Sequence, residues 1–580
     1  MNITIEKNVP VRMRDSTRLF ADVYRPAVPG RFPVLLARLP YDKESGPMVS
    51  NSLDVLRAVQ SGYAVVAQDT RGRYASEGTF TPFFDEARDG ADTVEWAAAQ
   101  QWSSGAIGMF GASYFGATQW LAATQSPSAL RAIAPFITTD QYYESWAYQG
   151  GAFQLGFNLH WILVSLALGE VTRQIGDGKA TARDFASVVA ALDGNDSLYR
   201  RLPLRSVAEI REVAPYYLDW LDHPAYDGYW RATAPCESYP SIKVPALNMG
   251  GWYDLFLKGT LANYTGMKQH GGTAEARRGQ RLVIGPWAHG ATTGWFPEGS
   301  FGWRGGTDGY DLTAHQLRWF DWRLKGEDNG VARDKPVQLF VMGINQWRGA
   351  EDWPLPGTEF VDYFLHSGGR ANTAGGDGVL STEAPSDEPE DAYVYDPRDP
   401  VPTTGGATFL PGLPVGANAG PRDQRVPESR PDVLCYTTGP LAAPLEVIGP
   451  VRLVLHICSS APDTDFTAKL VEVWPDGRAV NLADGILRAR YRTSLSEPCL
   501  LEPGKIYEVT VDLVATANVF AAGHRIRLEV SSSNFPRFDR NTNTGGVMAD
   551  QTEADLRQAV NRVFHDHRRP SRLVLPVVGP

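Results

Sequence analysis

Short apolar runs alternate with amphipathic stretches up to about residue 140, and this alternation constrains the fold more than any other feature of the sequence. The apolar runs are typical of strands buried on both faces, and they occupy residues 33–41, 64–69, 107–111 and 132–137. Residues 85–99 lie between two of these runs and show helical periodicity, with acidic residues in the first turns, as the helix dipole favours. Strands that alternate with helices form a mainly parallel sheet, so an α/β fold is expected.

The strand signal fades between about residues 141 and 238, where residues 152–168 and 180–192 are predicted to be helical with polar loops between them. It returns at residues 244–254 and 281–290, which are again short and apolar. The simplest arrangement is a helical insert between two strands of one sheet. The α/β core is therefore expected in two parts, residues 1–140 and 239–350, with a helical cap insert over residues 141–238.

Beyond about residue 350 the pattern changes to alternating short strands separated by Gly, Pro and Asp turns, which is typical of a β-sandwich or jelly roll. The strands are expected at residues 453–460, 468–475, 506–513, 524–533 and 572–578. Residues 367–391 are rich in Gly, Ser, Pro and acidic residues and are expected to form a long surface loop. Residues 351–580 are thus predicted to be a C-terminal β domain.

The charge balance and the cysteine content exclude several classes of function. Lys and Arg number 55 against 66 Asp and Glu, which gives a net charge of −11 and a surface that repels phosphate backbones and anionic membranes. Four scattered cysteines without a C-x-x-C pair indicate neither a disulfide framework nor a zinc site, and they fit a reducing compartment. No signal peptide is visible, and residues 157–168, the most apolar stretch, are too short to span a bilayer. A cytoplasmic protein that binds neither nucleic acid nor membrane is expected.

The sharpest local motif is Gly-Met-Phe-Gly-Ala-Ser-Tyr-Phe-Gly over residues 108–116, between a predicted strand and a predicted helix. A nucleophile elbow needs a strained strand-to-helix turn that exposes a serine hydroxyl, with small residues beside it. Ser113 is the expected nucleophile, and Gly111 supplies the small residue two positions before it. The glycine usually found two positions after the serine is replaced by Phe115, and Gly116 follows one place later.

A serine nucleophile needs a base, and an acid that orients the base. In folds with a nucleophile elbow these follow in the order acid, then histidine, each in a loop after a strand. Asp254 closes the predicted strand at residues 244–254, and His289 lies at the end of the one at residues 281–290. Taken singly, the alternatives are an aspartate that caps a turn and a structural histidine. Their order, and their places at the carboxyl edge of a parallel sheet, favour a triad with Ser113.

Acyl transfer also needs donors aimed at the developing oxyanion. The backbone N–H of Tyr114, next after the nucleophile, is the expected first donor. Lipases place an HGGG-type run after an early strand for the second donor, and no such run exists here. Arg-Leu-Pro-Tyr-Asp-Lys stands there instead, so the Tyr41 hydroxyl is the candidate, with an amphipathic boundary residue as the alternative. Such a mechanism needs no metal and no organic cofactor.

Six runs together resemble the cocaine esterase branch of the X-prolyl dipeptidyl-peptidase and acylase family, over essentially the whole chain. They are RLPYDK (residues 38–43), QDTRGRYASEG (68–78), GMFGASYFGATQW (108–120), GGWYD (250–254), GPWAH (285–289) and SSSNFPRFDRNTNTGG (531–546). The resemblance implies an α/β-hydrolase core, a helical cap inserted before the acid-bearing strand, and a C-terminal, galactose-binding-like jelly roll that helps to roof the active site. Position by position, it places the nucleophile on Ser113, the acid on Asp254, the base on His289 and the oxyanion tyrosine on Tyr41.

The resemblance also implies where a substrate lies. The matching positions are Trp146, Trp161, Phe256, Phe409, Leu410 and Asn51. Trp146 and Trp161 are in the cap, and Phe256 is beside the acid. Phe409 and Leu410, in the C-terminal domain, match a pair that contacts the substrate from the other side. Asn51 matches a residue that faces the substrate nitrogen. For each aromatic residue, ordinary core packing is the alternative.

One departure from the family narrows the range of substrates to be expected. The α-amino-acid ester hydrolases of this family carry an acidic pair just after the catalytic aspartate, whereas the residues here are Leu255, Phe256 and Leu257. An apolar wall penalises a bare ammonium group by desolvation. We therefore expect a serine hydrolase that cleaves carboxylic esters with neutral or aromatic acyl groups through an acyl-enzyme intermediate.

Two other functions remain open. An amidase, an acylase or an X-prolyl dipeptidyl-peptidase would use the same triad, so that only the apolar wall distinguishes it. A non-catalytic carbohydrate-binding protein built on an inactive hydrolase is the alternative from another class, since β-sandwiches often bind sugars. The expected partner is a small-molecule ester. Exposed edge strands are compatible with a homodimer, although nothing in the chain specifies one.

Overall fold

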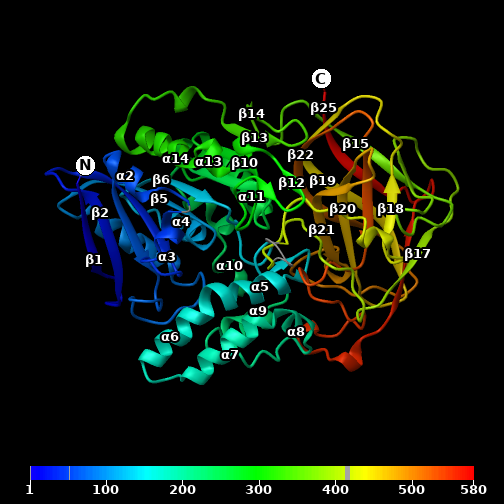
Figure 1. Cartoon of the computed structure of the whole chain (residues 1–580), viewed down its shortest axis with the longest axis horizontal. Helices are drawn as coiled ribbons and strands as arrows, with labels where there is room; N and C mark the ends of the chain where they lie inside the picture. Colours follow the sequence, from blue (N-terminus) through cyan, green and yellow to red (C-terminus); the bar gives the residue numbers. More distant parts are fainter. Residues whose placement is uncertain (1, 51, 412–417, 580) are drawn as a thin grey trace.

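The computed structural model describes residues 2–50, 52–411 and 418–579. Figure 1 shows an α/β part (blue and green), a group of helices from the segment between its two halves (cyan) and a C-terminal β part (yellow to red). The α/β part and the C-terminal β part lie side by side, and the cyan helices lie along the lower side of the molecule in this view.

The central sheet has ten strands within the described residues, in the order β1-β2-β4-β3-β5-β6-β9-β10-β13-β14. Their bounds are β1 (Ile3–Arg12), β2 (Arg18–Pro26), β3 (Phe32–Leu39), β4 (Ala64–Asp69), β5 (Ser103–Ala112), β6 (Leu130–Phe136), β9 (Leu247–Tyr253), β10 (Arg281–Ala288), β13 (Val337–Val341) and β14 (Gln346–Ala350). From β4 to β13 along this order the strands are parallel, whereas β1, β2 and β14 pair antiparallel. All six apolar runs predicted as strands in the two halves of the core lie in the parallel stretch, so the expected α/β core is confirmed.

Helices pack against the central strands and hold the carboxyl end of β5 in position. The helix α3 (Glu86–Ala98) packs against α4 (Tyr114–Thr124), which also contacts β3, β5 and β6. The residues of α4 are buried up to Ala123 on every side of the helix, as expected for a helix enclosed in a core. The other helices of this part are α1 (Gly46–Ser50), α2 (Val55–Gln60), α11 (Leu257–His270), α12 (Ala274–Arg278), α13 (Thr307–Tyr310) and α14 (Leu312–Phe320). This packing places Ser113, the residue before α4, at the carboxyl edge of the sheet.

The segment between β6 and β9 is mainly helical. It contains β7 (Tyr148–Gln149), β8 (Ala152–Phe153), α5 (Leu155–Trp161), α6 (Leu168–Gly176), α7 (Ala182–Asp193), α8 (Asn195–Arg200), α9 (Tyr216–Asp222) and α10 (Gly228–Arg231). The helix predicted over residues 152–168 is wrong at its start, because β8 pairs with β7 in a short hairpin. Gly150 and Gly151 form the turn with φ values of 54° and 80°, which an L side chain rarely adopts.

The longest helix of this segment runs from Leu155 to Gly176 and passes through a π-helical stretch, Ile162–Ala167. It has 22 residues and contains an 18-residue window of mean hydropathy 1.3, so by length and composition alone it could cross a membrane, and the expectation that this region is too short for a bilayer is wrong. In the structure 67% of its most apolar window is buried inside the protein. The amphipathic turns of α6 add the length that the apolar run alone does not have.

The C-terminal part is built from β-strands. Its sheet runs in the order β17-β24-β19-β25-β15-β16-β18-β23-β20-β21, with β22 beside β19. The bounds are β15 (Thr358–His366), β16 (Val379–Ser381), β17 (Asp391–Tyr395), β18 (Leu434–Thr437), β19 (Leu445–Ser459), β20 (Asp465–Val473), β21 (Ala479–Arg488), β22 (Tyr507–Phe520), β23 (Arg525–Ser531), β24 (Ala559–Phe564) and β25 (Arg572–Val578). Each of the five predicted strands overlaps one of these. The loop predicted over residues 367–391 is not continuous, because β16 lies within it and pairs with β15 and β18.

Buried hydrogen bonds join the C-terminal part to the start of α5. The Phe153 N–H donates to Asp539 at 2.9 Å, and the Gly156 N–H donates to the Pro536 carbonyl at 2.8 Å. Leu410, from the C-terminal part, lies in the apolar cluster that contains the residues of α5. The C-terminal part therefore contributes side chains to the region around α5, where the candidate site lies.

Candidate active site

Ser113 lies in a strained turn between β5 and α4. Its backbone angles are φ 57° and ψ −122°, a conformation that costs a non-glycine residue roughly 1–3 kcal/mol. The turn is held because the Ser113 N–H donates to the Phe136 carbonyl of the neighbouring β6 at 2.9 Å. A serine held in this way between a strand and a helix has the geometry of a nucleophile elbow.

Two glycines make room for this turn. A Cβ on Gly111 would lie 2.2 Å from the Phe115 ring, and one on Gly116 would lie 2.9 Å from the Thr138 side chain. Gly111 also has a φ of 141°. The ring of Phe115, which stands where such elbows usually have glycine, therefore packs over the bare Gly111 backbone, and the second small residue is needed one position later.

His289 lies between Ser113 and Asp254. Its Nε2 is 3.1 Å from the Ser113 Oγ, and its Nδ1 is 2.9 Å from the Asp254 Oδ2. Asp254 directly follows β9 and His289 directly follows β10, and these strands are parallel neighbours. The structure thus brings together the three residues that the sequence predicts as a triad.

The surroundings of the aspartate set the proton positions in this group. Asp254 is 1% exposed, and its Oδ1 accepts the Phe256 N–H at 2.7 Å. Because an ionised carboxylate only accepts hydrogen bonds, its contact assigns a proton to the Nδ1 of His289 and leaves Nε2 free to accept the proton of Ser113. His289 is buried, whereas Ser113 is half-buried, so the serine is the member most open to a substrate.

The backbone of Tyr114 supplies one donor next to Ser113. Tyr114 is the first residue of α4, where backbone N–H groups have no partner inside the helix and the helix dipole is positive. Its hydroxyl is used elsewhere, since it donates to Glu86 at 3.0 Å and accepts the Phe83 N–H at 2.9 Å. The side chain therefore anchors Tyr114, and its backbone N–H is the group available to an oxyanion.

The Tyr41 hydroxyl is the candidate for the second donor. It follows β3 and interacts with the Ser113 side chain and with Trp161, whose Nε1 donates to it at 2.8 Å. Burial raises the pKa of Tyr41, and its hydrogen bonds with Trp161 and Ser113 oppose this rise only in part. The hydroxyl consequently keeps its proton at neutral pH and can donate it in a hydrogen bond.

Two buried cations anchor the loop that carries Tyr41. The Nε of Arg73 donates to the Pro40 carbonyl at 3.0 Å. Lys43 binds Asp69 through its backbone N–H at 2.8 Å and through its ammonium group at 3.0 Å. The loop is thus fixed on both sides of the tyrosine.

The aromatic residues predicted to contact the substrate form one cluster beside His289. Trp146 stacks on Phe256 with ring centroids 4.5 Å apart, and Trp161 meets Trp146 edge to face at 5.1 Å. Phe256 and Phe409 each meet the His289 ring edge to face at 5.1 Å. The structure therefore brings Trp146, Trp161 and Phe256 together in one cluster, and places Phe256 and Phe409 against the candidate base.

The other two predicted contacts are placed differently. Leu410 is buried and packs onto the start of α5, where its Cδ2 lies 2.5 Å from the position that a Cβ on Gly156 would take. Asn51 lies outside the described residues. Its proposed contact with a substrate nitrogen stays a prediction.

Phe157 is a residue of this cluster that the sequence interpretation missed. Its ring centroid lies 6.4 Å from that of His289, 6.3 Å from that of Phe409 and 5.6 Å from that of Phe256. Phe157 stands four positions before Trp161 on α5, so the two side chains lie on the same face of the helix. That spacing is the signal in the sequence that points to it.

Comparison with known proteins adds to this geometry. The sequence profile of the X-Pro dipeptidyl-peptidase (S15) family matches residues 15–291, and the profile of the X-Pro dipeptidyl-peptidase C-terminal non-catalytic domain matches residues 329–574. A protein named cocaine esterase, from Rhodococcus sp. (strain MB1 Bresler), is 43% identical over 580 residues, which cover 100% of this chain and 99% of that protein. The chain belongs to the X-Pro dipeptidyl-peptidase (S15) family.

Two solved structures resemble this S15 protein over nearly their whole length. An α-amino acid ester hydrolase is 26% identical with a TM-score of 0.81, covering 99% of this chain and 96% of that one. An aminopeptidase from the marine sediment archaeon Thaumarchaeota archaeon is 25% identical with a TM-score of 0.81, covering 100% and 97%. The predicted family and the α/β-hydrolase core are confirmed. This S15 protein is a serine hydrolase of ester or peptide bonds.

The residues after the candidate acid are apolar in this S15 protein. Leu255 and Leu257 are both buried, the first in the apolar cluster of the candidate site and the second in a cluster shared by the central sheet and the C-terminal part. The first charged residue that follows is Lys258, whose ammonium group lies 2.9 Å from both Glu144 and Asp512. The charge nearest in sequence to the candidate acid is thus a cation already held by two carboxylates.

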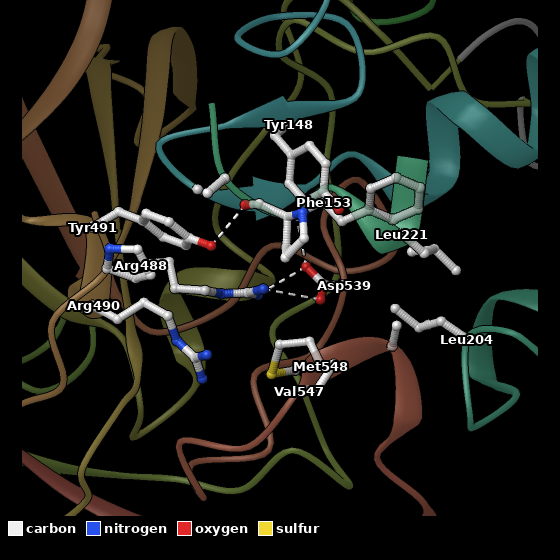
Figure 2. A pocket seen from close by; sticks show the side chains of 15 residues that line it. Tyr148, Phe153, Leu204, Leu221, Arg488, Arg490, Tyr491, Asp539, Val547 and Met548 are labelled. Carbon is white, nitrogen blue, oxygen red and sulfur yellow. Dashed lines mark hydrogen bonds and ion pairs between the residues drawn. The ribbon is translucent and has the colours of Figure 1, made fainter. Parts of the chain in front are cut away.

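A separate cavity of about 130 Å³ lies between the inserted helices and the C-terminal part of this S15 protein (Figure 2). Its walls are largely apolar and include Phe153, Leu204 and Met548. Arg488 lies at one side and binds Asp539, as the dashed lines in Figure 2 show. None of the residues predicted for the active site lines this cavity.

The described part of this S15 protein holds no group of three or more His, Cys, Asp or Glu side chains placed to bind a metal ion. Its four cysteines are not paired in disulfides. The expectation that the reaction needs neither a metal nor an organic cofactor stays a prediction.

Proposed function

We propose that this protein hydrolyses carboxylic esters in two steps through a triad of Ser113, His289 and Asp254. The observation that carries the proposal is an unbroken chain of contacts, 3.1 Å from the Ser113 Oγ to the imidazole Nε2 and 2.9 Å from the imidazole Nδ1 to the Asp254 Oδ2. In such a chain a neutral imidazole accepts the serine proton, and the carboxylate stabilises the imidazolium that forms.

In the first step the Ser113 oxygen attacks the ester carbonyl while its proton passes to the Nε2 of His289. The tetrahedral intermediate expels the alcohol, which takes that proton, and the acyl group stays on the serine. In the second step His289 deprotonates a water molecule that attacks the acyl carbon, and the carboxylic acid leaves as the serine regains its proton. The Tyr41 hydroxyl and the Tyr114 N–H stabilise the oxyanion of each intermediate.

The acyl group in this proposal is neutral or aromatic. Trp146, Trp161, Phe256 and Phe409 offer ring faces and edges but no charge. A well-oriented aromatic pair contributes roughly 0.5–1.5 kcal/mol beyond the burial of its area. A free ammonium group would instead lose its hydration against these rings without gaining a carboxylate partner. The uncharged wall therefore supports an aryl ester over an aminoacyl substrate or a peptide with a free N-terminus.

Rates on three substrates test this proposal. We expect kcat/KM for a phenyl benzoate to exceed that for an X-prolyl anilide and for an acylated β-lactam by roughly tenfold or more, because an apolar wall discriminates against a charged acyl group. Stopped-flow measurement of phenol release should also show a burst equal to the enzyme concentration. An X-prolyl anilide that is the fastest substrate would show that the protein is a dipeptidyl-peptidase with the same triad.

The variant Phe256→Asp is the matched test of the wall. It puts a carboxylate directly against the site, so the ratio of the rates on an aminoacyl ester and on the benzoate should rise relative to wild type. The thermal unfolding midpoint is measured alongside, because this residue is fully buried. An unchanged ratio in a folded variant would remove Phe256 from the acyl wall.

Removing the Tyr41 hydroxyl in Tyr41→Phe is expected to lower kcat roughly 10²–10³-fold with little change in KM, because the bond to the oxyanion forms only as charge develops. The variant Tyr63→Phe is the control, since its buried hydroxyl bonds to Asp321 instead, at 2.7 Å, and its loss should leave kcat unchanged. If Tyr41→Phe kept the full wild-type kcat, this hydroxyl would be excluded as an oxyanion donor.

We also infer that the C-terminal β part is a jelly roll. Its antiparallel pairings join strands that are far apart in the chain, since β19 pairs with β22, β24 and β25. Such long-range antiparallel pairing is typical of the Greek-key connections from which a jelly roll is built.

A further inference from the structure

We propose that Trp161 is a positioning residue whose indole N–H holds the Tyr41 hydroxyl so that its proton faces the oxyanion. The inference rests on the proposed ester hydrolysis and on the oxyanion role given there to Tyr41. The sequence interpretation makes Trp161 only a wall of the acyl site. In the structure its Nε1 lies 2.8 Å from the Tyr41 hydroxyl oxygen, and both side chains are buried, 2% and 8% exposed.

The chemistry of the two groups fixes the direction of this hydrogen bond. An indole N–H donates and cannot accept, so Trp161 is the donor. The Tyr41 oxygen is therefore the acceptor in this contact, and its own proton must point elsewhere. A phenol O–H lies near the plane of its ring and points to one side or the other. A donor on one side leaves the proton on the opposite side.

We infer that the opposite side of the hydroxyl faces the reacting atoms. The other group that interacts with the Tyr41 hydroxyl is the side chain of Ser113, which the proposed mechanism brings against the substrate carbonyl. The Tyr114 N–H has a direction fixed by its helix, whereas a hydroxyl can rotate. Stabilisation of an oxyanion is greatest when the donors need no reorientation as charge develops. The Trp161 bond supplies that preorganisation to Tyr41.

Aromatic neighbours hold the Trp161 ring in place. It stacks on Trp220 with centroids 6.1 Å apart and an interplanar angle of 11°, and it meets Trp146 edge to face at 5.1 Å and 79°. Trp161 is also the last residue of α5, directly before the π-helical stretch. Such stretches are rare in proteins and occur frequently at functional sites.

One guanidinium fixes the two partners relative to each other. Arg73 donates through Nε to the carbonyl of Pro40, the residue before Tyr41, at 3.0 Å. It donates through Nη2 to the carbonyl of Leu166, in the π-helical stretch after Trp161, also at 3.0 Å. Arg73 is 2% exposed. Removal of the indole N–H alone should therefore leave the loop and the helix where they are. The change is then confined to the Tyr41 hydroxyl, whose proton becomes free to rotate.

The test replaces Trp161 by 3-benzothienylalanine, which keeps the fused rings and has sulfur where the N–H was, with Trp161→Phe as a second variant. We expect kcat to fall roughly five- to tenfold, the effect of one lost hydrogen bond, with KM unchanged. The factor should be the same for phenyl benzoate and phenyl acetate, because the oxyanion is common to both. In a Tyr41→Phe background the same replacement should change kcat by less than about twofold, because coupled residues are not additive.

The variant Trp220→Phe is the matched control, because it alters the ring stacked on Trp161 and leaves the N–H in place. Its effect should be the same with and without the Tyr41 hydroxyl. A loss from the benzothienyl replacement that persists in Tyr41→Phe, or that grows with the size of the acyl group, would overturn the proposal and leave Trp161 as an acyl wall alone. Full turnover in Tyr41→Phe itself would overturn the oxyanion role on which the inference rests.

Discussion

Replacing Ser113 by alanine is expected to lower kcat on an aryl ester roughly 10⁶-fold. The serine oxygen is the atom that bonds to the acyl carbon, and without its hydroxyl His289 has no proton to accept in the first step. Only the oxyanion donors remain, acting on the direct attack of water. Stopped-flow measurement should show the burst of phenol in wild type and none in Ser113→Ala, and a fluorophosphonate probe should label wild type alone.

A second serine with a positive φ provides the control. Ser126 follows α4 at its other end, has a φ of 51°, and donates its hydroxyl to the Ser241 carbonyl. Ser126→Ala should keep the wild-type kcat, so any loss common to both variants would reflect strain in the backbone. A burst retained by Ser113→Ala would place the nucleophile on another residue.

The parallel strands of the core were predictable because each contains a short, mainly apolar run that is buried on both faces. The strand β4, Ala64–Asp69, begins and ends at the predicted residues. The strand β1 was not recognised, because it lies at the edge of the sheet and most of its side chains are partly or fully exposed. An edge strand can carry as many charges as a loop, so its composition gives little signal.

The errors in the inserted segment have a local cause. A two-residue strand such as β8 has no periodicity to detect, and the positive φ values at Gly150 and Gly151 mark only the turn that joins it to β7. The extension of the helix to Gly176 was missed because the expected end followed hydropathy, whereas α6 is amphipathic. The strand β16 was missed for a similar reason, since its three residues lie in a polar stretch.

Some residues of the candidate site could be predicted from the sequence, and others could not. Ser113, Asp254 and His289 each directly follow a parallel strand, so topology alone predicts that they meet at one edge of the sheet. The contact between Tyr41 and Trp161 joins residues 120 positions apart, and no spacing in the sequence encodes it. The aromatic cluster is intermediate, because the face of α5 that bears Phe157 is readable from its helical period, but the approach of Phe409 depends on how the C-terminal part docks.

Replacing Arg488 by methionine is expected to lower the free energy of unfolding by about 3–5 kcal/mol. The guanidinium is 2% exposed and binds two buried carboxylates, Asp465 at 3.0 Å through Nε and Nη2 and Asp539 at 2.8 and 3.1 Å through Nη2 and Nη1 (Figure 2 shows Arg488 and Asp539). Methionine keeps most of the length but leaves two carboxylates buried without a cation. Urea titration followed by tryptophan fluorescence measures the change.

The pH dependence of this loss distinguishes unpaired charge from a packing defect. Burial raises the pKa of Asp465 from 3.8 to about 6, against the opposing effect of Arg488. The folded state therefore binds this proton more readily than the unfolded chain, so the contribution of Asp465 to stability falls as pH rises from 3.8 to about 6. Without Arg488 the folded-state pKa rises further. In Arg488→Met the fall should then continue above pH 6, and the deficit relative to wild type should shrink on acidification.

Arg490→Met is the matched control for this prediction. Arg490 also lines the cavity of Figure 2, but its side chain is 13% exposed and it pairs with a single carboxylate, Asp463, at 2.8 Å. Its replacement leaves one buried carboxylate without a cation, and Asp463 still accepts the Arg490 backbone N–H and the Asn541 side-chain amide, both at 2.9 Å. The loss of stability and its pH dependence should therefore both be smaller. Adding Asp539→Asn to Arg488→Met should restore part of the stability, because it removes one of the two uncompensated charges. A deficit in Arg488→Met that is the same from about pH 5 to about pH 8 would show that lost packing, and not buried charge, is responsible.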